Sequence, residues 1–194
     1  MNKKIIITAV LLLVNSVANA AIVSFEEPSG SLGRISHYEE NGVVFTGAFN
    51  HVQTGPKGSA VTSSSFMQYR WYSKLNFGMA DGSSFDLVSI DLAELSQRSA
   101  KPSTVTFFGQ RTDSAIVSQT FTTDGLFCVD NHGFQTFNFS DEFRGLENVY
   151  LADASLKMNS YFAFDNVNVS AVPLPAAVWL FIAGLLSLFA YSRR

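Results

Sequence analysis

The chain has 194 residues, of which 47% are hydrophobic and only 15% are charged. This composition excludes a mainly disordered chain, and about 150 residues between the two ends suffice for one domain with a substantial core. Residues 21–175 carry all 16 acidic and 9 of the 13 basic side chains, and this net charge of −7 argues against a nucleic-acid-binding role.

The N-terminus is typical of a secretory signal peptide. Lys3 and Lys4 form a positive start, residues 5–14 are almost entirely apolar, and Ala18 and Ala20 are the small residues that signal peptidase accepts. We expect export through the Sec pathway and removal of residues 1–20. A permanent membrane anchor is the alternative, but the apolar run is about half of a spanning length.

Short segments with alternating apolar side chains predict an all-β domain over residues 21–170 without a helix of core length. The clearest segment is 85–93, where Val88, Ile90 and Leu92 alternate with polar residues. The other predicted strands are 21–25, 42–49, 68–72, 74–79, 105–107, 117–121, 136–139, 147–153 and 161–169. About ten short strands and many phenylalanines favour a two-sheet β-sandwich of the jelly-roll type, with residues 50–65 as a long exposed loop.

The sequence carries no spacing typical of a catalytic or zinc site. Cys128 is the only cysteine, so it is either buried or available for an intermolecular bond. His37, His51 and His132 are scattered, and no nucleophile elbow, phosphate loop or dinucleotide motif is present. We therefore expect no enzymatic activity. A glycoside hydrolase is the less favoured alternative, because a fold can bring two distant carboxylates together.

Two acidic segments stand near the start and the end of the domain. The first and last strands of jelly rolls often lie close together, which would bring Glu26 or Glu27 near Asp165. Carboxylate oxygens are ligands that Ca²⁺ prefers. The apolar side chains also change phase at Asp165, which predicts a β-bulge there. Solvated or capping carboxylates without a metal are the alternative.

These two segments are similar to the opening and closing motifs of galactose-binding-like jelly rolls, which include several carbohydrate-binding module families. The resemblance implies that Glu26, Glu27 and Asp165 hold a structural calcium ion. It also implies recognition of a carbohydrate.

Tyr69 and Trp71 lie on the same side of a predicted strand, which makes them candidates for stacking on a sugar ring. Trp71 is the only tryptophan between residues 21 and 170. A lone tryptophan in a β-sandwich is more often part of the core, and this interpretation of Trp71 is favoured.

The C-terminus combines a proline motif, an apolar run and two terminal cations. The motif is Val172-Pro173-Leu174-Pro175-Ala176, and the apolar run covers residues 176–191. A helix over that run rises about 24 Å, which predicts a marginal single transmembrane span. Arg193 and Arg194 would hold its end on the cytoplasmic side. A buried core helix fits less well, because the run has no polar face.

Residues 172–194 closely resemble the VPLPA variant of the PEP-CTERM sorting signal, and residues 85–93 resemble a segment that recurs in the cargo domains of such proteins. Tails of this family are cleaved near the proline motif by exosortase-like membrane proteases of Gram-negative bacteria that secrete exopolysaccharide. The resemblance implies a protein anchored in the inner membrane and then sorted to the cell envelope, surface or extracellular matrix, with extracellular polysaccharide as its partner. The alternatives are an unprocessed tail anchor and a purely structural surface or biofilm component without a defined ligand.

Overall fold

The computed structural model describes residues 20–26, 33–52, 65–69, 75–94, 102–125, 133–151 and 162–172. All of them belong to one compact unit, Asn19–Val172. The elements are β-strands and one turn of 3₁₀ helix at Asp141–Phe143, which confirms the predicted all-β class. Across these described ranges, no helix is long and apolar enough to span a membrane.

The strands agree with the predicted segments, with one addition. They are β1 (Ala20–Val23), β2 (Gly33–Glu40), β3 (Val43–Val52), β4 (Phe66–Tyr69), β5 (Leu75–Met79), β6 (Phe85–Glu94), β7 (Thr104–Arg111), β8 (Ile116–Thr122), β9 (Gln135–Asn138), β10 (Leu146–Leu151) and β11 (Phe162–Ala171). The sequence did not predict β2, because only Tyr38 of this strand is fully buried and no alternation results. Residues 50–52 belong to β3, so this part of the predicted loop is wrong.

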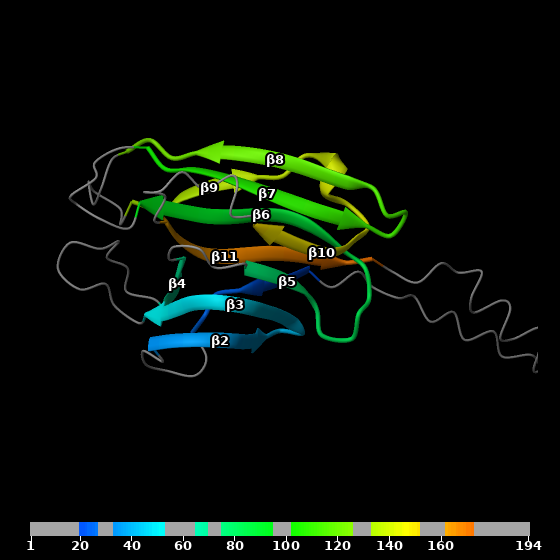
Figure 1. Ribbon diagram of the computed structural model, residues 1–194, viewed down its shortest axis with the longest axis horizontal. Helices are drawn as coiled ribbons and strands as arrows, with labels where there is room; N and C mark the ends of the chain where they lie inside the picture. Colours follow the sequence, from blue (N-terminus) through cyan, green and yellow to red (C-terminus); the bar gives the residue numbers. More distant parts are fainter. Residues whose placement is uncertain are drawn as a thin grey trace, which may run out of the picture. The chain divides into compact units, whose positions relative to one another are not determined.

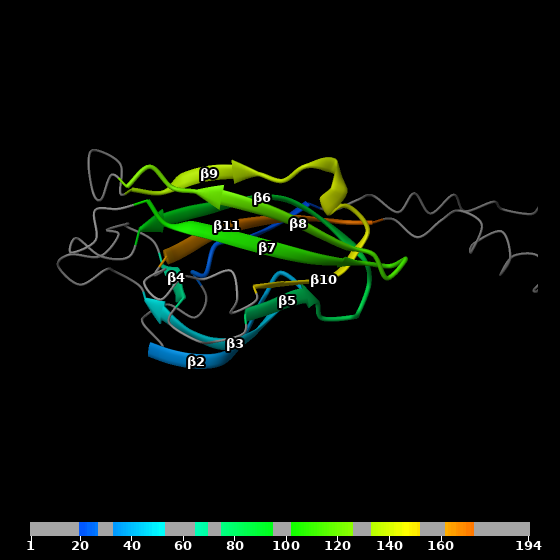
Figure 2. The same cartoon turned by 45° about the horizontal axis from the view of Figure 1, so that its top comes forward.

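All strands belong to one hydrogen-bonded network. Its order is β8-β7-β10-β5-β3-β4-β11-β6-β9, with β2 added to β3 and β1 added to β11. Figure 1 shows β8, β7, β10, β5, β3 and β2 in succession from top to bottom. Figure 2 shows β6, β9 and β11 in a layer opposite β2, β3 and β5. The strands thus form two layers, but β4 pairs with both β3 and β11, and β10 pairs with β6. These pairings join the layers, so two separate sheets are not present.

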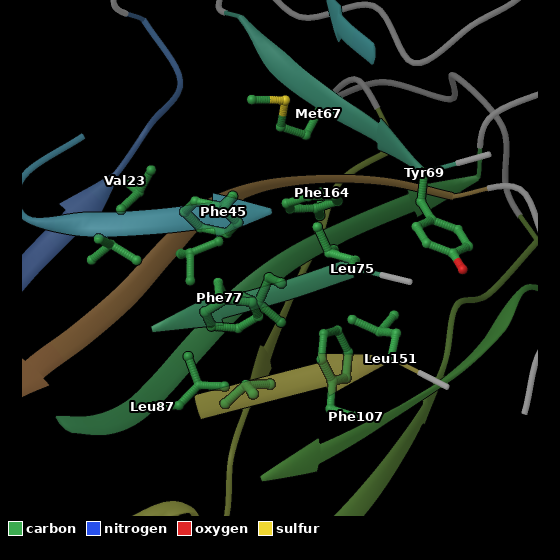
Figure 3. Close-up of a cluster of buried hydrophobic side chains, with 14 of the residues drawn as sticks. Val23, Phe45, Met67, Tyr69, Leu75, Phe77, Leu87, Phe107, Leu151 and Phe164 are labelled. Carbon is green, nitrogen blue, oxygen red and sulfur yellow. The ribbon is translucent and has the colours of Figure 1, made fainter. Parts of the chain in front are cut away.

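The core between the layers consists mainly of phenylalanine side chains. The ring of Phe45 lies 5.3 Å from that of Phe25, 5.0 Å from Phe77 and 6.2 Å from Phe164, measured between centroids. Figure 3 shows Phe45, Phe77 and Phe164 among the side chains that fill this space. Each buried aromatic side chain removes about 150–250 Å² from water, so these rings dominate the stability of the fold.

Glu40 fixes the segment that follows β1. Its carboxylate accepts hydrogen bonds from the backbone N–H groups of Ser24 at 3.2 Å and Phe25 at 2.8 Å, and from the hydroxyl of Tyr38 at 2.7 Å. Phe25 has a φ of 58°, which is unfavourable for a bulky residue. The bonds to Glu40 hold this conformation, and the conformation places the Phe25 ring in the core.

Candidate binding face

One row of side chains crosses six strands on the side that points away from the core. Strand register pairs Phe108 with Ser118 and with Tyr150, and it pairs Tyr150 with Asn76. Asn76 is in turn paired with Thr46, and Thr46 with His37. Directly paired residues share a face of the sheet. None of these side chains is fully buried, so the row lies at the surface.

The centre of this row is an aromatic pair. The rings of Phe108 on β7 and Tyr150 on β10 lie 5.4 Å apart with an interplanar angle of 15°, so they are stacked. Both side chains are half-buried. A partly exposed, stacked pair offers a rigid apolar platform next to the polar neighbours of the row.

A second row next to the platform carries two carboxamides. Register pairs Gln110 with Asn148 and with Ile116. The Asn148 Nδ2 group donates a hydrogen bond to Gln110 Oε1 at 3.5 Å. The side-chain oxygen of Asn148 is buried and accepts no hydrogen bond. An unsatisfied buried acceptor costs roughly 1–3 kcal/mol, so Asn148 would gain from a donor that reaches this oxygen.

Gly78 completes the second row where β5 approaches β10. It is paired with Val44 on β3. A Cβ atom at this position would lie 2.9 Å from the backbone oxygen of Glu147, at the register shift of β10 between Leu146 and Asn148. Glycine is therefore required for the close approach that aligns Asn76 beside Tyr150.

Four threonines extend the surface along β7 and β8. The hydroxyl groups of Thr104 and Thr122 lie 3.1 Å apart, and those of Thr106 and Thr120 lie 2.8 Å apart. We call these four residues the threonine ladder. The outer face comprises the ladder and the two rows between β8 and β3: Ser118, Phe108, Tyr150, Asn76, Thr46, Ile116, Gln110, Asn148, Gly78 and Val44.

The residues predicted to bind calcium are described only in part. Glu26 Oε1 accepts a hydrogen bond from the Ser65 N–H at 3.1 Å, and the buried Ser65 hydroxyl has no hydrogen-bond partner. Asp165 is 3% exposed. Glu27 lies outside the described residues. Among the residues that are described, no three His, Cys, Asp or Glu side chains come together as a metal site. Calcium binding therefore stays a prediction.

The predicted bulge at Asp165 is confirmed. The register between β11 and β6 shifts between Asp165 and Asn168, and Asn166 has a φ of 46°. The Asn166 N–H donates to Asp165 Oδ1, and its side-chain amide donates to Asp91 Oδ2, both at 2.8 Å. Asp91 and Asp165 are directly paired, but Asp165 is buried. This carboxylate pair is thus not accessible to the substrate of a glycoside hydrolase.

Tyr69 requires a correction. Its side chain is fully buried, and its ring stacks on Phe162 with 5.1 Å between centroids. A ring enclosed in the core offers no face to a sugar. Trp71, Cys128 and His132 lie outside the described residues.

The two predicted processing sites border paired strands. Ala20 is paired with Ser170 on β11, and the N–H of Val172 donates to the carbonyl of Ser84 at 3.2 Å. The remaining targeting residues lie outside the described part of the chain: Ala18, Pro173, Leu174, Pro175, Ala176, Arg193 and Arg194, together with the predicted span 176–191.

Phe108 and Tyr150 were not predicted as functional residues from the sequence. They are far apart in the chain and meet only because β7 pairs with β10, a strand that does not follow it in sequence. The alternation of Val105 and Phe107 indicated a strand but gave no partner for it. A sequence signal for this pairing was therefore absent.

No protein-family model and no curated protein matches the sequence. Several solved structures are similar. A family 29 carbohydrate-binding module has 10% identity and a TM-score of 0.41, over 79% of this chain and 91% of that chain. A family 11 module from Clostridium thermocellum has 11% identity and a TM-score of 0.40, over 82% and 99%. A cyclase from Fischerella sp. TAU has 14% identity and a TM-score of 0.42, over 81% and 100%. These scores are too low to assign a family or a function.

Proposed function

We propose that the chain is an exported, non-enzymatic protein of the cell envelope or extracellular matrix that binds polysaccharide through its outer face. The observation that carries the proposal is the stacked pair Phe108–Tyr150 beside the carboxamides of Asn76, Asn148 and Gln110.

The chemistry of a sugar fits this combination. A pyranose ring has an apolar C–H face, which packs on an aromatic ring, and a rim of hydroxyl groups, which both donate and accept hydrogen bonds. A carboxamide offers both functions in one side chain, and the threonine and serine hydroxyls add more. The platform would hold the ring, and the surrounding polar groups would select its hydroxyl pattern.

The cellular part of the proposal depends on the ends of the sequence. The signal-like residues 1–20 and the sorting-like residues 172–194 predict Sec export, a membrane-anchored stage and cleavage by an exosortase-like protease.

Affinity electrophoresis of the full-length chain in detergent tests the binding function. The gels contain exopolysaccharide from the native host. The double variant Phe108→Leu/Tyr150→Leu keeps apolar bulk on both strands but removes the flat rings. We expect it to lose at least about tenfold in affinity, which corresponds to roughly 1.4 kcal/mol. Val88→Ala, on the exposed part of β6, is the matched control and should bind like the native chain.

Unchanged retention of the double variant would show that the platform is not the binding site. Absence of retention of the native chain would favour a structural component without a ligand.

Intact mass of the protein from its host tests the sorting. A mass without residues 1–20 and without the residues after about Pro175 is expected, whereas retention of residues 176–194 in the inner membrane would indicate an unprocessed anchor.

A further inference from the structure

The outer face differs in charge from the rest of the domain. Residues 21–175 have a net charge of −7, yet none of the side chains that form the outer face is an Asp, Glu, Lys or Arg. Between β8 and β3 its polar groups are carboxamides and hydroxyls, and the first row then ends on β2 at the exposed imidazole of His37. The surface is therefore locally neutral within an acidic protein.

The charged side chains around this face are mainly acidic. Glu39 on β2 is paired with Val44, and Glu147 is exposed at the register shift of β10. Arg111 at the end of β7 directly follows Gln110, and its Nε atom lies 3.8 Å from the carboxylate of Asp113. Among the described residues, the part of the face between β8 and β3 thus contains no Lys or Arg that is available to a ligand carboxylate.

This charge pattern selects between two classes of polysaccharide. A uronate or sulfate group placed on the platform would lose water without gaining a cation, which is unfavourable. It would also meet Glu39 and Glu147 at the borders. A neutral sugar avoids both costs, because hydroxyl groups need only the donors and acceptors that the face provides.

The threonine ladder indicates that the ligand is longer than one ring. Side chains on one face of a strand repeat every ~6.6–6.8 Å, so Thr104, Thr106, Phe108 and Gln110 form a stripe of about 20 Å along β7. A single pyranose on the platform covers only part of this stripe. The paired hydroxyls of the ladder keep further hydrogen-bonding capacity for a neighbouring sugar unit.

We infer that the ligand of the outer face is an uncharged polysaccharide, bound by the platform and the threonine ladder together. This inference depends on the proposed function and adds the chemical class of the ligand. It predicts that an exopolysaccharide rich in uronic acids is not the direct ligand, even where it forms part of the same matrix.

Retention of the full-length chain is measured in gels that contain defined polysaccharides at low salt. The neutral probes are a mixed-linkage β-glucan and a galactomannan, and the acidic probes are alginate and polygalacturonate. We expect retention by at least one neutral probe and by neither acidic probe.

Thr106→Val/Thr120→Val removes two hydroxyls without changing side-chain shape. It should weaken binding of a neutral hexasaccharide several-fold while leaving binding of the corresponding disaccharide nearly unchanged.

The introduction of a positive charge provides the second test. Ser118→Lys places a cation beside Phe108 and should create retention by alginate, whereas Val88→Lys adds the same charge on β6 and should not. Retention of the native chain by acidic probes alone, lost in Phe108→Leu/Tyr150→Leu, would overturn this inference and leave the proposed function intact. The proposed function and this inference would both be overturned if no probe and no host polysaccharide retained the chain. They would also be overturned if Phe108→Leu/Tyr150→Leu left the retention unchanged.

Discussion

Phe107 and Phe108 are adjacent residues of β7, but they have opposite environments. Phe107 is 1% exposed, and its ring lies 5.3 Å from Phe139 and 6.0 Å from Phe121. Phe108 is half-buried on the outer face and contacts Tyr150. Because successive side chains of a strand point to opposite faces, the same residue type supports folding on one side and is available for binding on the other. The role of an aromatic residue therefore depends on strand register and not on its identity.

The largest expected effect is on stability and concerns the buried residue of the two, Phe107. Phe107→Ala removes a ring packed against two other aromatic rings and should lower the free energy of unfolding by about 3–5 kcal/mol. Chemical denaturation followed by circular dichroism measures the loss. A loss of similar size in Phe108→Ala would contradict the distinction between the two faces.

Calcium would stabilise the domain without contacting either ring. If Glu26, Glu27 and Asp165 hold the ion, a hundredfold excess of Ca²⁺ over its dissociation constant should raise the free energy of unfolding by about 2.7 kcal/mol. Thermal unfolding with EDTA and then with added Ca²⁺ measures this difference. Asp165→Asn should remove the calcium dependence, and Asp113→Asn, in the exposed turn after β7, is the control. Identical curves in EDTA and Ca²⁺ would contradict the metal site.

A smaller effect on stability is expected for Phe108 on the outer face. Phe108→Ala removes a stacked pair from a half-exposed position and should cost about 0.5–1.5 kcal/mol beyond lost area. The same denaturation experiment measures it, and Thr46→Ala in the same row should change stability by less than about 0.5 kcal/mol. If Phe108→Ala lost binding without any change in stability, the difference between the inner and outer faces would be larger than expected.

The smallest effect concerns an exposed turn that belongs to neither face. Hydrogen bonds from the Ser83 hydroxyl and N–H hold the pKa of Asp81 below its ordinary value of 3.8. The stabilisation from this depressed pKa is present above pH 3.8 and is lost as the pH falls through the pKa of the folded state. NMR titration of the Asp81 carboxyl should show the pKa rising in Ser83→Ala. An unchanged pKa would mean that the hydroxyl contributes nothing.

The sequence predicted local features of the fold and missed the ones that depend on pairing between distant strands. The alternation in residues 85–93 identified β6, and the phase change at Asp165 identified the bulge, because both patterns are contained in a few consecutive residues. The edge strand β2 has one buried side chain and was missed. Tyr69 became a stacking candidate because it was expected to alternate with its neighbours in a half-buried strand. All of Phe66–Tyr69 is buried, so this alternation gives no exposed side.

The outer face could not be predicted for a related reason. Its rows combine β8, β7, β10, β5 and β3, and this order does not follow the order of the strands in the chain. Composition showed that aromatic side chains were plentiful, but 18 phenylalanines are ample for a core and gave no reason to place one outside. Only the register between Phe108 and Tyr150 distinguishes this pair from the others.

The hydrogen bond from Val172 to Ser84 also has a mechanical consequence. β11 is paired with β6 along most of its length, and with β4 and β1 on its other edge. A force applied at Val172 along the strand therefore acts on these ladders in shear, so that many hydrogen bonds bear the load at once. A strand peeled from an edge, such as β8, would instead lose its bonds one after another. Tension applied at the end of β11 would therefore be shared by the ladders on both edges of this strand.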